Sequence, residues 1–162
     1  MKSDICINTP DGIFNYRVGA IIQHDNKLLM EKNSGDNFYY TIGGRVKFGE
    51  SAPETVMREA LEETGLPLEI ERLAFIHENF FTFESSQEPC HEICFFFLMK
   101  SHEKLSEIQQ TFNEAYGEVG IYWLAIDKLG DYMIYPEFFK TELAKQSSHV
   151  RHIVTRDGEI FG

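Results

Sequence analysis

The sequence predicts an α/β (α+β) protein in which helices cover both sides of a mixed β-sheet. Strand-like and helix-like segments are interleaved along the chain, which is typical of layered folds of this class. The 162 residues, 43% of them hydrophobic, are enough for one domain with a substantial core. We see no repeat, low-complexity tract or linker, so residues 1–162 are predicted to form a single domain.

The first predicted strands lie near the N-terminus. Residues 14–23 (FNYRVGAIIQ) alternate and then become apolar, which indicates a strand. Asp25-Asn26 is typical of a tight turn, so residues 28–32 (LLMEK) are predicted to complete a hairpin. After the polar loop 33–37, residues 38–44 (FYYTIGG) are predicted to form a strand that ends in a glycine pair.

The clearest predicted helix runs from Ser51 to Thr64. Ser51 is a favourable N-cap, and Glu54 three residues later completes a capping box. Pro53 is tolerated in the first turn because the N–H that it lacks has no helical partner there. Gly65 is a typical residue for the end of a helix.

The two faces of this helix are predicted to differ. An apolar stripe is expected to pack on the sheet and consists of Val56, Met57, Ala60, Leu61 and Thr64. Glu59, Glu62 and Glu63 are spaced at i, i+3 and i+4 and are predicted to project from the opposite side. Because Glu59 and Glu63 would repel each other in an isolated helix, the cluster needs an explanation.

The second half of the chain continues the mixed pattern. Residues 66–83 and 91–100 are predicted to form two long strands joined by a turn, and residues 119–126 (VGIYWLAI) a further strand. A short helical turn is predicted to begin near residue 127. Residues 136–146 are predicted to form an amphipathic helix with Pro136 at its start. The tail 147–162 shows no pattern that assigns an element.

Composition and charge exclude several classes of protein. With a net charge of -11, the chain is not expected to bind nucleic-acid backbones through general electrostatics, whereas a small phosphate compound can bind if a divalent cation binds first. The three cysteines have no metal or redox spacing and favour a reducing, cytoplasmic location. The start has no signal-peptide pattern, and no apolar stretch reaches 18 residues, so no membrane span is predicted.

The glutamate cluster predicts a metal site. Magnesium and manganese prefer oxygen ligands, and two phosphates bridged by the same ions would complete their coordination. A carboxylate left free of metal would deprotonate an attacking water. The alternative is a solvated, salt-bridged face. Arg58, which Glu54 and Glu62 flank at i−4 and i+4, is a single cation among many acids and makes that alternative less favourable.

The wider context of the cluster is a known motif. Residues 44–66 (GRVKFGESAPETVMREALEETGL) match the Nudix box at every fixed position and without a gap. The matching residues are Gly44, Glu50, Arg58, Glu59, Glu62, Glu63 and Gly65, with Ala60 and Leu66 at the aliphatic positions. The chain therefore resembles the Nudix, or MutT-like, hydrolases. The resemblance implies a Nudix-type α/β/α sandwich.

The resemblance also implies the reaction and the site. Members of the family use Mg²⁺ or Mn²⁺ and water to break a phosphoanhydride bond in a nucleoside diphosphate derivative. By position, Glu59, Glu62 and Glu63 are the expected metal ligands, together with the backbone carbonyl of Gly43. One of Glu62 and Glu63 is expected to orient or deprotonate the water. In addition, Arg58 is expected to hold the catalytic carboxylate, and Glu50 to support the site.

The substrate contacts are expected outside the box. Tyr39 and Tyr40 lie near the glycine pair, and Phe81 lies on the next long strand. Each is a candidate to stack on a base, although aromatic residues at alternating strand positions are more often core. Arg17 is expected either to meet a phosphate or to be exposed. Many members add an acid from a later segment, for which Glu118 is preferred over Glu114; the alternative is that both are solvated loop acids.

Several identities remain open at this point. An ADP-ribose or nucleotide-sugar pyrophosphatase, a damaged-nucleotide triphosphatase and a dinucleotide polyphosphate hydrolase all fit the box. A non-catalytic ligand sensor with the same fold is less favoured, because the chain keeps all the box acids and has no room for a DNA-binding domain. An isoprenoid diphosphate isomerase generally departs from the standard box. A homodimer is a further expectation, since many members of the family are dimers.

Overall fold

The structure is a computed structural model that describes residues 2–108, 112–113, 119–145 and 147–161. Its strands are β1 (Cys6–Thr9), β2 (Gly12–Ile21), β3 (Gln23–His24), β4 (Lys27–Asn33), β5 (Tyr39–Arg45), β6 (Ile70–Thr82), β7 (Pro89–Met99), β8 (Phe112–Asn113), β9 (Val119–Ala125), β10 (Ile134–Tyr135), β11 (Arg151–Arg156) and β12 (Glu159–Phe161). The helices are α1 (Ala52–Thr64), α2 (Phe139–Glu142) and the 3-10 segments η1 (Leu105–Glu107) and η3 (Ile126–Asp131).

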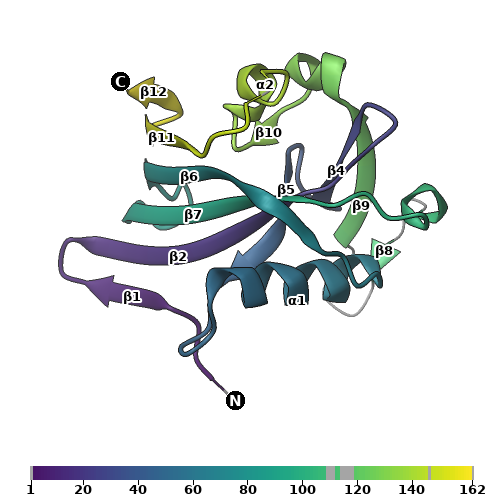
Figure 1. The fold of residues 1–162 in the computed structure, drawn as a ribbon. Helices are drawn as coiled ribbons and strands as arrows, with labels where there is room; N and C mark the ends of the chain where they lie inside the picture. The colour runs from purple at the N-terminus through teal and green to yellow at the C-terminus, as the bar shows by residue number, and fades with distance from the viewer. Residues whose placement is uncertain (1, 109–111, 114–118, 146, 162) are drawn as a thin grey trace.

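The strands form one mixed sheet in the described part of the chain. Its order is β12-β11-β6-β7-β2-β5-β4-β9-β8, with β1, β3 and β10 paired at the side. Three pairs are parallel, β2 with β7, β6 with β11, and β5 with β10, whereas the others are antiparallel. Figure 1 shows α1 on one side of this sheet and α2 on the other. This arrangement confirms the predicted layers.

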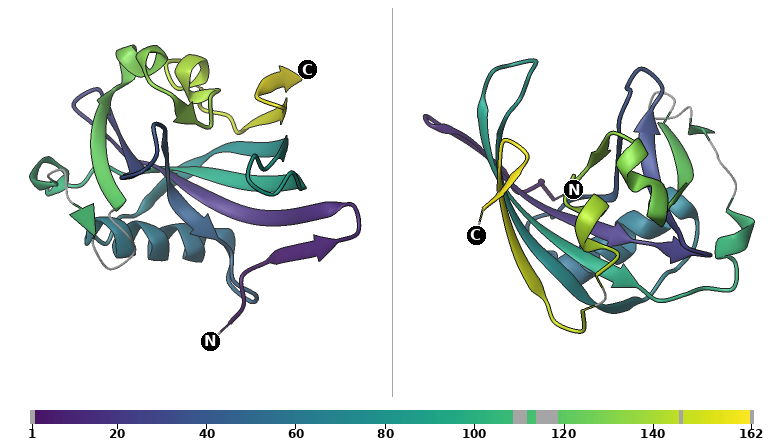
Figure 2. Two further views of the ribbon diagram at one scale, coloured as in Figure 1. Left: turned by 180° about the vertical axis from the view of Figure 1, so that it is seen from behind. Right: turned by 90° about the horizontal axis from the view of Figure 1, so that it is seen from above.

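The sheet is curved and reaches beyond α1. In Figures 1 and 2, the ends of β2, β6 and β7 and the hairpin β11–β12 extend past the helix. The strand β5 lies between β2 and β4 and so joins the part of the sheet that contains β2, β7 and β6 to the part that contains β4 and β9. It pairs with β2 through residues 42–45 and with β4 only through Met30–Thr41 and Glu31–Tyr40.

Alternation along the strands divides the core into two clusters. Val18, Ala20 and Ile42 point toward α1 and pack with Val56 and Ala60 of that helix. The opposite face of the sheet is covered by α2 and η3, and its buried cluster includes Ile21, Met30, Phe96, Phe138 and Phe139. No helix within the described ranges is both long and apolar enough to cross a membrane.

The predicted turn and helix caps are confirmed. Asp25 and Asn26 have positive φ angles of 48° and 56°, as a tight hairpin turn requires. Ser51 caps α1 by accepting a hydrogen bond from the Glu54 N–H, and the Glu54 carboxylate accepts one from the Ser51 N–H at 2.8 Å. Gly65 ends the helix in the left-handed conformation, with φ 75°.

Other predictions of elements are wrong in their bounds. The strand predicted from residue 66 begins at Ile70, and the helix predicted over 136–146 contains only one regular turn, Phe139–Glu142. The tail without a predicted element supplies β11 and β12, and β11 lies parallel to β6. This pairing joins segments that are more than 70 residues apart, so local sequence patterns do not reveal it.

The buried face of α1 was also predicted incorrectly in part. Met57 is 39% exposed and Leu61 47% exposed, whereas Ala52, Thr55, Val56 and Ala60 are buried. Met57 and Leu61 are thus apolar residues on the solvent side of the helix, not members of its packed face. The centre of the buried face lies about a quarter of a turn from the predicted one, toward Glu59 and Glu63.

One buried histidine predicts a pH dependence of stability. His77 on β6 is 3% exposed, and its ring lies 2.8 Å from the Thr155 hydroxyl. Burial lowers the pKa of His77 to about 4, from an ordinary value near 6.5. As the pH falls, the histidine of the unfolded chain binds a proton before the buried His77 of the folded chain does. The contribution of His77 to the free energy of unfolding is therefore complete above about pH 6.5 and decreases by about 3 kcal/mol toward pH 4.

The variant His77→Gln tests this prediction. Glutamine can keep a hydrogen bond to Thr155 but does not titrate. Urea unfolding at pH 7 and at pH 4.5 should show a smaller loss of stability in the variant than in the parent protein. An equal loss in both proteins would mean that His77 does not contribute to acid sensitivity.

Candidate active site

The helix α1 brings the glutamates of the box against β5. The Glu59 carboxylate lies on the Gly44 backbone, so closely that a Cβ added to Gly44 would be 2.4 Å from Glu59 Oε1. Only glycine leaves this space free. The last residues of β5 and the middle of α1 therefore define one site at the surface of the sheet.

We expected all three glutamates to project away from the packed face of α1. In the structure only Glu62 does so. At about 100° per residue, Glu59 and Glu63 lie between Thr55 and Val56, two buried residues on the side of the helix that faces the sheet. The Glu59 side chain is only 15% exposed, whereas that of Glu62 is 56% exposed. Two of the carboxylates are thus partly buried beside β5, and the third reaches solvent.

Arg58 links the acids of the box. Its Nε and Nη2 donate to the two oxygens of Glu50 at 2.7 and 3.1 Å, and its Nη1 donates to Glu59 at 2.9 Å. A longer bond of 3.4 Å reaches Glu62. Of the two acids that flank Arg58 on the helix, it therefore pairs with Glu62, whereas Glu54 belongs to the capping box. The guanidinium lowers the pKa of Glu50 to about 2.

Glu31 is a residue of the site that was not predicted from the sequence. Glu31 lies on β4, is 5% exposed, and contacts the Glu63 carboxyl. Burial raises the pKa of both groups, and each is close to the negative charge of Glu59. The signal was available in LLMEK (28–32): Glu31 shares the inward face of its strand with Leu29, where an acid is unusual.

The donor set fits a divalent cation. Glu63 Oε2 is buried and has no hydrogen-bond donor among the described residues. Such an oxygen, beside two other carboxylates, is the kind of ligand that Mg²⁺ and Mn²⁺ prefer. No three histidine, cysteine or acidic side chains within the described ranges are already gathered around one point.

The aromatic candidates occupy different places. The Tyr40 hydroxyl donates to Asn33 Oδ1 at 3.1 Å, and burial followed by the charges of Glu31 and Glu63 raises its pKa to about 12. It lies beside the acids. In contrast, Tyr39 packs edge-to-face on Tyr122 in the cluster under α2, with ring centroids 5.4 Å apart. Tyr39 is a core residue on the side of the sheet away from α1.

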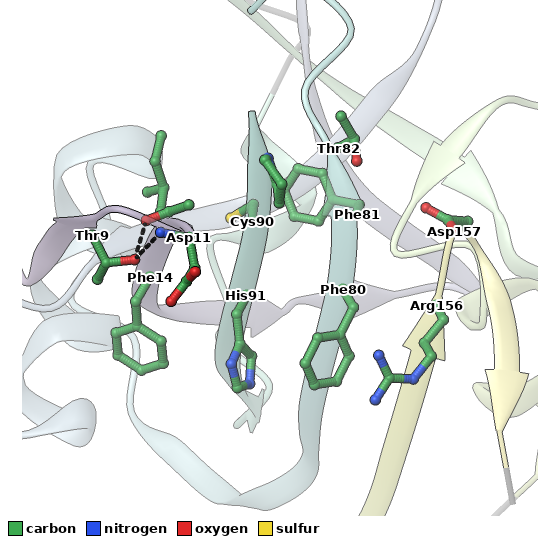
Figure 3. Close-up of a pocket in the computed structure, with 13 residues that line it drawn as sticks. Thr9, Asp11, Phe14, Phe80, Phe81, Thr82, Cys90, His91, Arg156 and Asp157 are labelled. Carbon is green, nitrogen blue, oxygen red and sulfur yellow. Dashed lines mark hydrogen bonds between the residues drawn. The ribbon is translucent and has the colours of Figure 1, made fainter. Parts of the chain in front are cut away.

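Phe81 lies outside the carboxylate site. It is on β6, which β7 and β2 separate from β5. Figure 3 shows its neighbourhood, a shallow cavity of about 490 Å³ at the far end of the sheet. There Phe80 stacks on His91, with ring centroids 4.3 Å apart, and the Arg156 guanidinium lies 4.0 Å from the Phe80 ring. The planar groups of Phe80, His91 and Arg156 therefore stack on one another.

The remaining candidates are Arg17, Gly43 and Glu118. Arg17 on β2 lies directly opposite Arg45 on β5, and its Nε is 3.9 Å from Glu92. Gly43 is next to the Glu59 contact, and it packs so tightly on β2 that a Cβ would be 2.1 Å from the Val18 carbonyl oxygen. Glu118 and its alternative Glu114 lie outside the described residues.

A cavity of about 400 Å³ opens beside Glu63, the partner of Glu31. Its ionisable lining residues are Glu63, Lys104 and Glu107, and the others are Thr64, Leu66, Ile108 and Ile121. The cavity lies between the end of α1 and η1. It gives the buried Glu63 carboxyl an open side.

The position of Arg58 leads to a prediction. The variant Arg58→Lys keeps the charge but removes the planar fork that holds Glu50 and Glu59 together. We expect turnover of the best substrate to fall by about 10-fold or more, with the urea midpoint changing much less. Activity equal to that of the parent would show that Glu59 does not depend on the fork.

The fold and these residues define a class of protein. It is an α/β/α sandwich in which helix α1 presents a set of acids beside the glycine pair Gly43-Gly44. A family model described as NUDIX domain matches residues 14–144. The chain belongs to this family.

Two curated relatives show local similarity. An ADP-ribose pyrophosphatase of Methanocaldococcus jannaschii is 37% identical over 65 residues, which are 38% of this chain and 38% of that protein. An NAD-capped RNA hydrolase, NudC, of Actinobacillus succinogenes is 40% identical over 58 residues, 36% of this chain and 21% of that protein. The chain thus spans less than two fifths of either relative.

Solved structures support the fold. A MutT protein from Bacillus halodurans superposes with a TM-score of 0.65 at 20% identity, covering 91% of this chain and 95% of that one. An ADP-ribose pyrophosphatase from Streptococcus suis has a TM-score of 0.53 at 18% identity and covers 85% and 98%. At these identities the likeness concerns the fold alone.

Proposed function

We propose that this protein hydrolyses a phosphoanhydride bond in a nucleoside diphosphate derivative, with Mg²⁺ or Mn²⁺ as cofactor. The observation that carries the proposal is the contact of Glu59 with Gly44, beside a buried Glu63 oxygen that lacks a donor. A purely structural acid pair would have its oxygens satisfied by the protein. The unmet oxygen of Glu63 supports the proposal, because a divalent cation accepts such an oxygen as a ligand.

Glu59, Glu62 and Glu63 would hold the cation, together with the backbone carbonyl of Gly43. When bound, the ion neutralises negative charge on the phosphates and polarises the bond that breaks. Arg58 holds Glu50 and Glu59 in place through three hydrogen bonds, and a fourth reaches Glu62. The protein thus supplies a fixed frame for the acids.

One of Glu62 and Glu63 takes the proton of the attacking water. Glu62 reaches solvent, and its bond to Arg58 at 3.4 Å is the longest in the network. Glu63 lies at the cavity near η1, where burial favours a carboxylate as a base. Glu62 borders solvent and Glu63 borders the cavity, so water that attacks a bound diphosphate can reach either carboxyl group.

The substrate is expected to be a small molecule such as ADP-ribose, a nucleotide sugar or a nucleoside triphosphate. ADP-ribose comes first because one curated relative carries the name of that activity. The net charge of -11 opposes binding of nucleic-acid backbones, and the cytoplasm supplies the metal and the nucleotides. Tyr40, which lies beside the acids, is the described aromatic group best placed to contact the substrate.

A panel of substrates tests this function. Purified protein should be incubated with Mg²⁺ or Mn²⁺ and ADP-ribose, UDP-glucose, nucleoside triphosphates, dinucleotide polyphosphates and NAD. We expect one class to yield a nucleoside phosphate in a reaction that EDTA stops. Tight binding without hydrolysis of any compound would instead support a ligand sensor.

A further inference from the structure

Part of the sheet is left uncovered by the described helices on the side where α1 lies. Figures 1 and 2 show β1, β11, β12 and the ends of β2, β6 and β7 beyond α1. The main contacts of α1 are with β5, β2 and β7. By strand alternation, the side chains of β2 that point to this side are those in step with Val18, which packs on α1. Phe14 and Tyr16 are therefore among them.

Two rows of side chains cross this uncovered area from edge to edge. In the register of the strand pairs, the first row is Ile7, Phe14, His91, Phe80, Arg156 and Glu159. The second row is Tyr16, Ile93, Glu78, Val154 and Phe161. We call these two rows the outer face. Aromatic and aliphatic side chains make up most of it, and the charged groups are few.

The same strands bury polar residues on their opposite side. Asn15, His77 and Thr155 are each 5% exposed or less. On the outer face, by contrast, Ile7 and Phe161 are 52% and 53% exposed, and the aromatic rings between them are partly exposed. A sheet with one solvated face normally turns its polar residues to water and its apolar residues inward. The reversed arrangement indicates that another surface covers the outer face.

The outer face is of a size that suits a stable interface. Neighbouring strands lie about 4.8 Å apart, and side chains on one face recur about every 6.8 Å along a strand. Six strands and three rows of side chains, the third containing Thr82 and Pro89, therefore present a flat area of roughly 600 Å². The relief of the side chains adds to this value, which approaches the roughly 800 Å² that each partner buries in a stable complex.

The charges of the outer face fit a second copy of the same chain. Although the chain has a net charge of -11, this face places Arg156 among only two acids, Glu78 and Glu159. Arg156 lies over the rings of Phe80 and Phe161, at 4.0 and 5.9 Å, and has no carboxylate partner within the described ranges. In a two-fold dimer each chain offers its acids to the arginine of the other. The face is thus complementary to itself in charge.

We propose that this protein forms a homodimer through the outer face. The aromatic rows of the two chains pack against each other, and Arg156 of each chain pairs with an acid of its partner. The apolar rows supply most of the binding energy, and the charged pairs fix the orientation of the chains. The interface does not include the glutamates of α1, so the inference is independent of the proposed hydrolysis.

Sedimentation velocity of the full chain over a range of concentrations tests the dimer. The parent should sediment with twice the 18.8 kDa mass of one chain. Ile7→Glu and Phe161→Glu should each weaken association by about 10-fold or more, because the interface would bury a charge without a partner. Both side chains are exposed in the single chain, so both variants should fold and keep the urea midpoint of the parent.

Met133→Glu is the matched control. Met133 is 46% exposed and lies between η3 and β10, away from the outer face, so this variant should dimerise as the parent does. Hydroxyl-radical labelling then locates the contact, since Tyr16 and Phe80 should be protected in the parent and labelled in Ile7→Glu.

Three results would overturn the proposal. The first is a parent that sediments as a single chain at every concentration. The second is association of the Ile7 and Phe161 variants as tight as that of Met133→Glu. The third is a dimer in which Tyr16 and Phe80 are labelled as strongly as in a single chain, because the contact would then lie elsewhere. None of these results bears on hydrolysis, which the substrate panel tests separately.

Discussion

Replacing Glu63 with glutamine is expected to reduce turnover of the best substrate by at least about 100-fold, the contribution typical of a positioned acid or base. The change keeps the size of the side chain but removes a charged oxygen at the site. Glu62→Gln is expected to have a comparable effect. Steady-state rates at saturating metal and substrate measure both.

The stability of the Glu63→Gln protein provides a second readout. In the metal-free parent, two buried carboxyls, Glu31 and Glu63, must share a proton or repel each other. An amide at residue 63 can donate to Glu31. We therefore expect the variant to be at least as stable as the parent in EDTA, so that its loss of activity is not a loss of folding.

Glu54→Gln is the control for both catalytic variants. Glu54 is on the same helix but is exposed and serves the cap. Its replacement should leave turnover unchanged and reduce stability only slightly, because Ser51 still caps the helix. Full activity in either the Glu62 or the Glu63 variant would remove that residue from the reaction.

The two glycines at the end of β5 are expected to respond differently to alanine. Gly43→Ala places a methyl group 2.1 Å from the Val18 carbonyl oxygen and 3.0 Å from Gly19 Cα. Because both are backbone atoms, the strands must separate. We expect a loss of at least about 3 kcal/mol in the free energy of unfolding, measured in urea.

Gly44→Ala meets a side chain instead. The methyl group would be 2.4 Å from Glu59 Oε1, which can move because it ends a flexible chain. The free energy of unfolding should change by about 1 kcal/mol or less, whereas displacement of Glu59 should lower turnover by about 10-fold or more. Gly35→Ala is the control, since nothing lies within 4 Å of its added methyl group. If Gly44→Ala unfolds the protein but keeps its specific activity, the contact with Glu59 is structural.

Much of the fold could be predicted because it depends on short-range chemistry. The capping box of Ser51 and Glu54, the stop at Gly65 and the turn at Asp25-Asn26 involve residues within a few positions of each other. Their geometry follows from local hydrogen bonds and allowed φ angles. The box glutamates could be found for the same reason, since their spacing lies within one helix.

The features that could not be predicted depend on distant partners. Glu31 becomes part of the site only because β4 passes beside the end of α1, and β11 is a strand only because β6 offers it an edge. Likewise, Arg45 lies inside the box but matches no fixed position, and only the register of the sheet places Arg17 opposite it. Pairing across the sheet, rather than local sequence pattern, decides these roles.

The measurement that tests the central claim most directly is hydrolysis of the best substrate in ¹⁸O-labelled water. If the glutamates of α1 direct water to a phosphoanhydride, one ¹⁸O atom should appear in a single phosphate group of one product. Incorporation should require Mg²⁺ or Mn²⁺ and be nearly absent with the Glu63→Gln variant. Label outside a phosphate group, or equal incorporation by parent and variant, would contradict this account.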